Sequence, residues 1–234
     1  MTRMFQGFTE ETIRFFLDIR FHNEVSFYRA HEDEYRKHVK EPFYQFIDSL
    51  AETMLSISPD IETRPSKCLA RLRRDTRFTK DKSPFRDHLW LLFRRGGEMR
   101  EGSVMYWFEL GPDRLVWGLG FWGQNRPAMD ALRKRMEEKP QEVRKVLRQC
   151  GIPDDTLHLF GDSYQRMKPP AGMPLELAML YPLKEIYVQR VNIPFEACYQ
   201  SSLSEIVAKD FLRLKPLYLL LRSAADEGRA QLDA

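Results

Sequence analysis

The stretch VMYWFELGPDRLVWGLGFW, residues 104–122, decides the fold. Its two halves, VMYWFEL and RLVWGLGFW, are rich in aromatic and β-branched residues, which favour strands. GPD between them is a short turn that contains proline, so the sequence predicts an antiparallel hairpin. Apolar residues occupy both faces of this hairpin. We therefore expect it either to lie centrally in a sheet that is covered on both sides or to line a cleft with one face.

Helical patterns precede the hairpin. Apolar residues at helical spacing behind Thr9 predict a helix over residues 10–21. A second pattern places a large side chain at every fourth residue from Phe27 to Val39, and Pro42 then restarts a helix with a buried apolar face. The proline-containing stretch SISPDIETRPS, residues 56–66, is expected to end this helical layer.

Two further elements are expected between that layer and the hairpin. From Ser66 the apolar period changes to two, which predicts a strand leading into RLRRDTRFTKDKSP, residues 71–84. Ser83 and Pro84 then form a cap and first-turn pair. They predict a helix that buries Leu89, Leu92 and Phe93 and stops at the glycine pair 96–97.

After the hairpin the pattern becomes helical again, with helices predicted over residues 126–138 and 140–150. Residues 153–174 are rich in Pro, Gly and Asp and predict a long loop, a candidate lid. EIYVQRVNI, residues 185–193, predicts another strand, and Ser204 is expected to cap a final helix.

These elements predict an α+β fold: a mostly antiparallel sheet of about four or five strands, packed with N-terminal and C-terminal helices. With 234 residues and an apolar fraction of 43%, the chain can bury a substantial core, so we expect a single domain over residues 1–234. Neither an internal repeat nor a low-complexity tract is present.

Several classes of protein are disfavoured by the sequence. MTRMFQGFTEE at the start turns acidic before an apolar segment develops, so we expect no secretory signal peptide and a cytoplasmic protein. The apolar run PLYLLL, residues 216–221, is far shorter than the ~20 residues that span a bilayer, so no membrane partner is expected. Cofactor and oligomeric state stay unknown at this level.

Metal and dinucleotide motifs are weak. The three cysteines, Cys68, Cys150 and Cys198, are widely spaced, which is typical of small core residues and predicts neither bridges nor structural zinc. His31 and His38 are two helical turns apart and cannot chelate as an i, i+4 pair, so we expect no metal site. GLGFWG, residues 118–123, matches G-x-G-x-x-G but lies within a strand, where glycine more often permits close approach.

The charge is unevenly distributed. Residues 64–100 contain twelve Lys and Arg against four acids, a local excess of +8, whereas the whole chain carries +3. Such an asymmetry attracts anionic partners. Arginines that pair with local aspartates and cover apolar surface with their stems would explain it equally well.

The segment 71–84 concentrates this charge in a regular order. In an extended chain Arg71, Arg73, Asp75 and Arg77 project from one face, and the other face carries Ala70, Leu72, Arg74 and Phe78. The aspartate neutralises only part of the first face, which leaves room for a phosphate or carboxylate held bidentately. Asp81 is a predicted turn acceptor, and Lys82 lies near the start of the predicted helix.

These residues also carry a family resemblance. Arg71, Arg74-Asp75, Arg77-Phe78, Asp81-Lys82 and Pro84 resemble the R-x-x-R-D-x-R-F-x-x-D-K-x-P core of the Domain of Unknown Function 2461 family. FQGFTEET, the hairpin, KPPAG and FLRLKPLYLLL are similar too, so the resemblance covers roughly residues 4–222. It implies a shared domain without an assigned activity. Where the family shows N-N-x-x-W-F, this chain has NEVSFY and keeps only Asn23 of the asparagine pair.

The first functional hypothesis is a binding module for an anionic small molecule or a nucleic-acid backbone at the Arg/Asp-rich corner. Its cations would hold phosphate, and aromatic rings of the hairpin would stack a base. The candidate ligand-binding residues are Arg71, Arg74, Arg77, Lys82, Asp75, Asp81, Tyr106, Trp107 and Trp122, with Trp117 on the same ribbon.

Two alternatives stay open. In the first, the same cleft hydrolyses or transfers a phosphoester, with Asp75 or Asp81 as general base or metal ligand. Because cations surround both aspartates, we expect depressed pKa values, which make poor bases at neutral pH. In the second, the corner is a purely structural Arg/Asp network that holds the strand against the next helix. Whether the protein is an enzyme is thus uncertain from sequence.

Overall fold

The computed structural model describes residues 4–77 and 79–232, so the expected place of Phe78 on the strand lies outside the described residues. The chain divides into two compact units. The first comprises the chain up to Phe93, Trp107–Trp117 and Ile193–Lys209, and the second comprises Arg94–Tyr106, Gly118–Asn192 and the chain from Asp210. Each unit is assembled from three separate segments, and the single-domain expectation stays a prediction.

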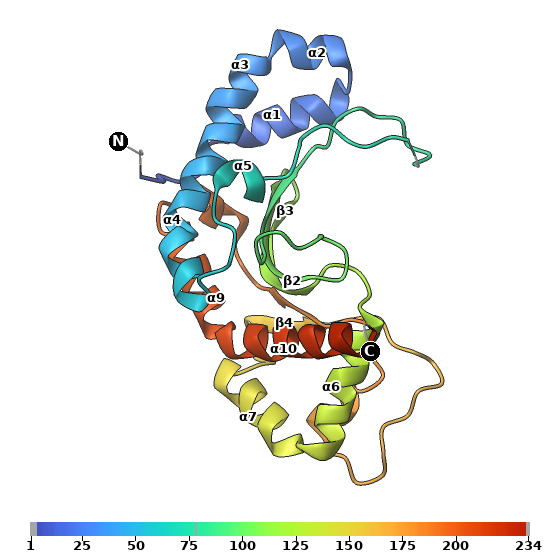
Figure 1. Ribbon diagram of the computed structural model, residues 1–234. Helices are drawn as coiled ribbons and strands as arrows, with labels where there is room; N and C mark the ends of the chain where they lie inside the picture. The colour runs from blue at the N-terminus through green and yellow to red at the C-terminus, as the bar shows by residue number, and fades with distance from the viewer. Residues whose placement is uncertain (1–3, 78, 233–234) are drawn as a thin grey trace. The chain divides into compact units, whose positions relative to one another are not determined.

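Within the described residues the strands form one antiparallel sheet of five, which confirms the α+β class (Figure 1). They are β1 (Leu89–Phe93), β2 (Val104–Gly111), β3 (Arg114–Phe121), β4 (Leu157–Phe160) and β5 (Tyr187–Arg190), in the order β1-β2-β3-β5-β4. The predicted hairpin is confirmed as β2 and β3, with Pro112 and Asp113 in the turn.

The first unit contains the N-terminal helices, which lie close together in Figure 1. They are α1 (Glu10–Phe21), α2 (Val25–Ala30), α3 (Glu32–Tyr35), a π-helical turn η1 (Arg36–Lys40), α4 (Glu41–Ile57) and α5 (Pro65–Cys68). The predicted helix over 10–21 is confirmed to the residue, and the later pattern is split into short helices before α4. A 3-10 turn η2 (Phe195–Tyr199) completes the unit together with the first residues of α9 (Leu203–Arg213).

Aromatic rings form the core of the first unit. Phe8 lies 4.9 Å from Phe43 between ring centroids, and Phe46 lies 4.5 Å from Phe108 on β2. Phe108 in turn stacks with Trp117 on β3, so one face of the hairpin is sealed by α4 and the N-terminal segment. All five rings are fully or almost fully buried, which fixes one sheet face as core.

The second unit is built around α6 (Arg126–Glu138), α7 (Pro140–Cys150) and α10 (Lys215–Leu232), which run close together in Figure 1. Both predicted helices, 126–138 and 140–150, are confirmed. Gly228 allows α10 to approach α6, because a Cβ there would lie 2.5 Å from the carbonyl carbon of Pro127. A short helix α8 (Leu175–Leu180) lies between β4 and β5 in the chain.

The predicted strand from Ser66 is wrong. Pro65 begins the one-turn helix α5, and the extended chain after it makes only isolated bridges, Leu69 with Leu91 and Arg73 with Phe85. Proline pre-sets the backbone angle of a first helical turn, so Pro65 favours a helix at this point. The alternation from Cys68 onward suggested a strand instead. The alternation itself holds locally, because Leu72 is buried while Arg71 and Arg73 are exposed.

The predicted helix after Ser83 and Pro84 is also wrong, since residues 89–93 form strand β1. The carbonyl of Pro84 accepts a hydrogen bond from the Arg74 backbone, so the proline belongs to a bridge and not to a helical turn. Leu89, Leu92 and Phe93 are buried as expected, because a short apolar run fits a buried strand as well as a helix. The expected strand-to-helix corner is therefore a loop between two extended segments.

Two smaller corrections concern the second half of the chain. The predicted loop 153–174 contains β4, which pairs with the confirmed strand β5. The predicted final helix is interrupted at Leu214 and becomes α9 and α10. The interpretation of the strand glycines is confirmed at Gly120, where a Cβ would lie 2.3 Å from the Tyr187 Cβ.

The three cysteines are buried and free, as expected of core residues. Across the described ranges, no helix combines the length and apolar character needed to span a membrane.

Candidate functional site

Apart from residue 78, the segment 71–84 is a largely exposed loop in which the described residues form two ion pairs. Arg77 donates from Nε and Nη2 to the carboxylate of Asp75, at 3.0 and 2.7 Å. Arg74 pairs with Asp81 across the loop, and Lys82 donates to the Thr76 carbonyl at 2.8 Å. Five of the predicted site residues are thus used in holding the loop in shape.

Both aspartates are poor proton acceptors at neutral pH. The hydrogen bonds from the Arg77 side chain and backbone lower the pKa of Asp75 to about 2. The pKa of Asp81 is also lowered to about 2, chiefly by its hydrogen bonds with Ser83 and then by Arg74. The expected depression of both pKa values is confirmed, as is the role of Asp81 as a turn acceptor, since the Ser83 backbone N–H donates to Asp81 Oδ1 at 2.9 Å.

Asn23 ties this loop to the turn between α1 and α2. Its amide nitrogen donates to the Phe85 carbonyl at 3.0 Å, and its oxygen accepts from the Phe85 N–H at 2.9 Å. The side chain therefore pairs with the loop as a neighbouring strand would. The asparagine that this chain retains has a structural role.

Arg86 supports the other side of the loop. One guanidinium nitrogen donates to the carbonyls of Arg71 and Arg73, at 2.9 Å each, while the guanidinium carbon lies 4.7 Å from the centre of the Trp90 ring. The guanidinium, itself placed against the Trp90 ring, thus holds the backbone of residues 71–73 by two carbonyls. The two arginine side chains of this segment are left to point outward.

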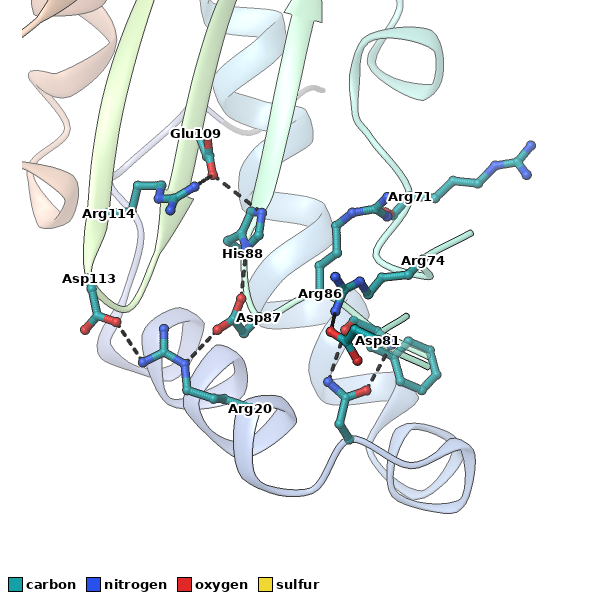
Figure 2. A network of polar contacts seen from close by, with 12 residues as sticks. Arg20, Arg71, Arg74, Asp81, Arg86, Asp87, His88, Glu109, Asp113 and Arg114 are labelled. Carbon is teal, nitrogen blue, oxygen red and sulfur yellow. Dashed lines mark hydrogen bonds and ion pairs between the residues drawn. The ribbon is translucent and has the colours of Figure 1, made fainter. Parts of the chain in front are cut away.

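Arg71 and Arg73 are exposed, and neither side chain has a protein partner in the part of the chain that the structure describes. Figure 2 shows Arg71 extending away from the dashed contacts of its neighbours. Both line a groove of about 500 Å³ whose other wall comes from α2 to α4. The groove is lined by Val25, Tyr28, Arg29, Glu32, Tyr35, Lys40, Tyr44, Ser66, Leu69, Ala70, Arg71, Leu72, Arg73 and Phe85.

The charge in this groove is unbalanced. Four lining side chains are cationic, Arg29, Lys40, Arg71 and Arg73, against the single carboxylate of Glu32. Among the described residues none of these five forms an ion pair, although Lys40 lies 5.4 Å from the centre of the Tyr44 ring. Unpaired cations in a concave surface bind anions well, because low-dielectric walls concentrate their field.

A second polar network lies at the turn end of the hairpin. Arg20 of α1 bridges Asp87 and Asp113 at 2.7 Å each, and Asp87 Oδ1 lies 2.8 Å from His88 Nδ1 (Figure 2). Burial raises the pKa of Asp87, but the hydrogen bonds from His88 and Arg20 outweigh it and lower the pKa overall. This network fastens α1 to the hairpin turn, and none of these four residues lines the groove.

His88 continues the network onto β2. Its Nε2 lies 3.5 Å from Glu109 Oε1, and Glu109 accepts a 2.5 Å hydrogen bond from Arg114. Gly111 makes room for the imidazole, because a Cβ there would lie 2.7 Å from the His88 Cβ. This arrangement could not be predicted from sequence, because its members come from three separate segments.

The aromatic residues predicted for the site are not gathered around Arg71. Tyr106 and Trp117 are fully buried, and the Tyr106 ring packs 4.8 Å from Phe211 and 5.3 Å from Tyr218. Such a ring offers no face to a base, so both residues are removed from the candidate site. Trp107 is half-buried on β2 and does not line the groove, and Trp122 lies in the second unit with Arg100 over its ring.

Sequence reasoning missed the helical wall of the groove. Tyr28 and Tyr35 lie seven residues apart, a spacing that places side chains on one helical face, and this was the available signal. Arg73 was expected on the correct face but was not among the candidate ligand-binding residues. In residues 4–77 and 79–232, no group of three or more His, Cys, Asp or Glu side chains is arranged to hold a metal ion.

Comparison with known proteins gives a family for this chain. The sequence pattern of the family described as conserved hypothetical protein (DUF2461) matches residues 11–219. The chain belongs to this family. The match includes the loop 71–84 and every residue that lines the groove, so the groove is part of the DUF2461 domain itself. No curated protein matches the chain.

Proposed function

We propose that this DUF2461 protein binds an anionic ligand, carrying phosphate or carboxylate groups, in the groove between residues 69–73 and helices α2 to α4. The observation that carries the proposal is the set of unpaired cations in a groove of about 500 Å³, with Arg71 and Arg73 on one wall. Ligand sites for small molecules have this range of volume. A guanidinium also matches the geometry of phosphate and carboxylate oxygens.

The predicted charged residues of the site fall into two groups. Arg71 is a direct ligand contact, joined by Arg73, Arg29 and Lys40. Arg74, Asp75, Arg77, Asp81 and Lys82 support the loop that presents them. A structural network thus explains these five residues, whereas the cations of the groove remain available to a ligand.

The phosphoester-cleaving alternative gains no support from these carboxylates. With pKa values of about 2, Asp75 and Asp81 are ionised at neutral pH and bind protons too weakly to act as efficient general bases. A nucleic-acid backbone remains a ligand that the test has to include, because its phosphates would meet the same cations.

The test is isothermal titration of the protein with pyrophosphate, citrate and an oligouridylate, at low and at physiological ionic strength. We expect salt-sensitive binding of at least one small anion, weakened by about tenfold or more in the double variant Arg71→Gln/Arg73→Gln, since each lost contact is a charge-assisted hydrogen bond. Arg14→Gln is the matched control, because Arg14 is an exposed cation of the same unit that does not line the groove.

Melting curves of the same variants separate binding from stability. Because Arg71 and Arg73 have no described side-chain partner, the double variant should melt at or above the wild-type temperature, whereas Arg74→Gln should melt lower through loss of its Asp81 pair. Absence of anion binding, or equal binding by wild type and double variant, rejects the proposed function. Binding of the oligouridylate alone would reassign the groove to nucleic acid.

A further inference from the structure

Three tyrosines converge on the anion groove from its helical wall. Tyr28, Tyr35 and Tyr44 are half-buried lining residues, and their rings come from α2, α3 and α4. Within the described chain, none of the three hydroxyls has a hydrogen-bond partner. Nor is any of them among the buried unpaired polar atoms, so each hydroxyl reaches solvent. Three phenol groups are thus free to bind a ligand.

The most enclosed of the three is Tyr35. Its ring lies 5.6 Å from Phe15 and 5.7 Å from Tyr28 between centroids. Burial, followed by the electrostatic influence of Tyr28 and Tyr44, raises the pKa of Tyr35 well above its ordinary value. Its hydroxyl therefore stays protonated at neutral pH and can both donate and accept a hydrogen bond.

The ring faces are less available than the hydroxyls. Tyr28 stacks on Phe85 with centroids 4.7 Å apart and planes 24° apart, and Tyr35 covers it from another direction. One face of Tyr44 is occupied by the Lys40 ammonium. A ligand with a large flat ring would have to displace these contacts, whereas a ligand with hydroxyl groups would use atoms that are free.

The carboxylate of Glu32 restricts the ligand further. It lines the groove together with Tyr28, and after burial its charge is the second cause that raises the pKa of that phenol. A ligand that is anionic along its whole length, such as a polyphosphate, would bring phosphate oxygens against this carboxylate. A hydroxyl group would donate to it instead.

We propose that the groove takes a phosphorylated polyhydroxy compound of the sugar phosphate class, with its phosphate on Arg71 and Arg73 and its hydroxyls on the three phenols and Glu32. This inference rests on the proposed function and specifies its ligand. Residues 71 and 73 supply cations for the anionic end. The helical wall carries Arg29 and Lys40 as well, and it supplies the phenol hydroxyls and the Glu32 carboxylate for the polyol.

Ribose 5-phosphate, inorganic phosphate and ribose are the probes, each titrated calorimetrically into the full-length protein. We expect ribose 5-phosphate to bind about tenfold or more tightly than inorganic phosphate, since it adds several hydrogen bonds. In Tyr35→Phe/Tyr44→Phe that preference should fall by roughly threefold to tenfold per lost hydroxyl, while the affinity for inorganic phosphate stays unchanged. The double arginine variant should lose affinity for both phosphorylated probes.

The Phe variants leave the apolar ring in place and remove an oxygen with no protein partner, so their melting temperatures should equal that of the wild type. Tyr199→Phe is the control, a half-buried tyrosine of the same unit outside the groove. Inorganic phosphate binding without any preference for ribose 5-phosphate, or a preference that is undiminished in the double Phe variant, overturns the ligand class alone. Failure of every phosphorylated probe overturns the anion site and this inference together.

Discussion

At the scale of single residues, Asn23 shows how one side chain can replace a strand. Its two hydrogen bonds to Phe85 join positions 62 residues apart in the chain, and Phe85 is almost fully buried. The backbone N–H of a buried residue cannot form a hydrogen bond with water when its partner is removed. These two hydrogen bonds therefore contribute more to stability than two exposed ones would.

We predict that Asn23→Ala lowers the free energy of unfolding by about 1–3 kcal/mol, because it leaves the buried Phe85 amide unpaired. Hydrogen exchange should speed up at the amide of Phe85, which donates to Asn23, and at the amides of Arg74 and Arg86, which hold the two extended segments together. Asn23→Asp is the control, since it keeps the acceptor for the Phe85 N–H and should lose less. Unchanged exchange at Phe85 in Asn23→Ala would contradict the role given to this side chain.

Arg71 marks the limit of prediction from sequence at this scale. That arginines alternate outward from residue 71 follows from the period of two, and the exposure of Arg71 and Arg73 agrees with it. Which aspartate neutralises which arginine depends on the path of the loop. Local spacing placed Asp75 and Arg77 on one face without predicting that they pair, and the Arg74–Asp81 pair depends on the turn at Asp81.

At the scale of elements, the hairpin and the helices with strong caps were predictable because their signals are local. The segments before the hairpin were not predictable in the same way. The one-turn helix at Pro65 and the isolated bridges after it depend on partners far away in sequence. Strand β1 shows the same ambiguity, because five consecutive large residues have no period that separates a buried strand from a helix. The tyrosine wall of the groove came from helices that were expected only as core.

The pairing of β3 with β5 depends on the absence of a side chain at position 120. In this register Gly120 faces Tyr187, and a Cβ would lie 2.3 Å from the Tyr187 Cβ and 2.6 Å from the Ile186 oxygen. Backbone has to move to relieve such contacts. The strands would then separate or shift their register.

We therefore predict that Gly120→Ala lowers the free energy of unfolding by about 2–3 kcal/mol or more, through overpacking between two strands. Gly97→Ala is the matched control, because its Cβ would meet nothing within 4 Å and only its φ of +80° opposes alanine. That backbone strain should cost about 1 kcal/mol. Chemical denaturation of both variants measures the difference, and equal losses would argue against the close approach at Gly120.

At the scale of the whole molecule, the carboxylates make stability depend on pH. Hydrogen bonds lower the pKa of Asp75, Asp81 and Glu62 to about 2, mainly from Arg77, Ser83 and Arg64 respectively. The pKa values of Asp154 and Asp226 are lowered as well. Because these folded-state pKa values lie below those of the unfolded chain, the stabilisation is present above about pH 4 and is lost as the pH falls through about 2.

Melting temperatures measured from about pH 6 down to about pH 2.5 should therefore decline mainly below about pH 4. Added salt should weaken the part that comes from Asp75 and Asp81, since their ion pairs with Arg77 and Arg74 are exposed and screened. A melting temperature that is constant over this range would mean that these carboxylates interact equally in the unfolded chain.

The position of Arg86 has a consequence for the association of several copies of the chain. β1 is the first strand in the sheet order, and a sheet margin ordinarily offers a row of amides and carbonyls on which another polypeptide can assemble. Residues 69–73 cover that margin in part, and the guanidinium of Arg86 occupies the carbonyls of residues 71 and 73. Two of the carbonyls on which another chain could assemble are therefore already bonded to a charged group of the same molecule.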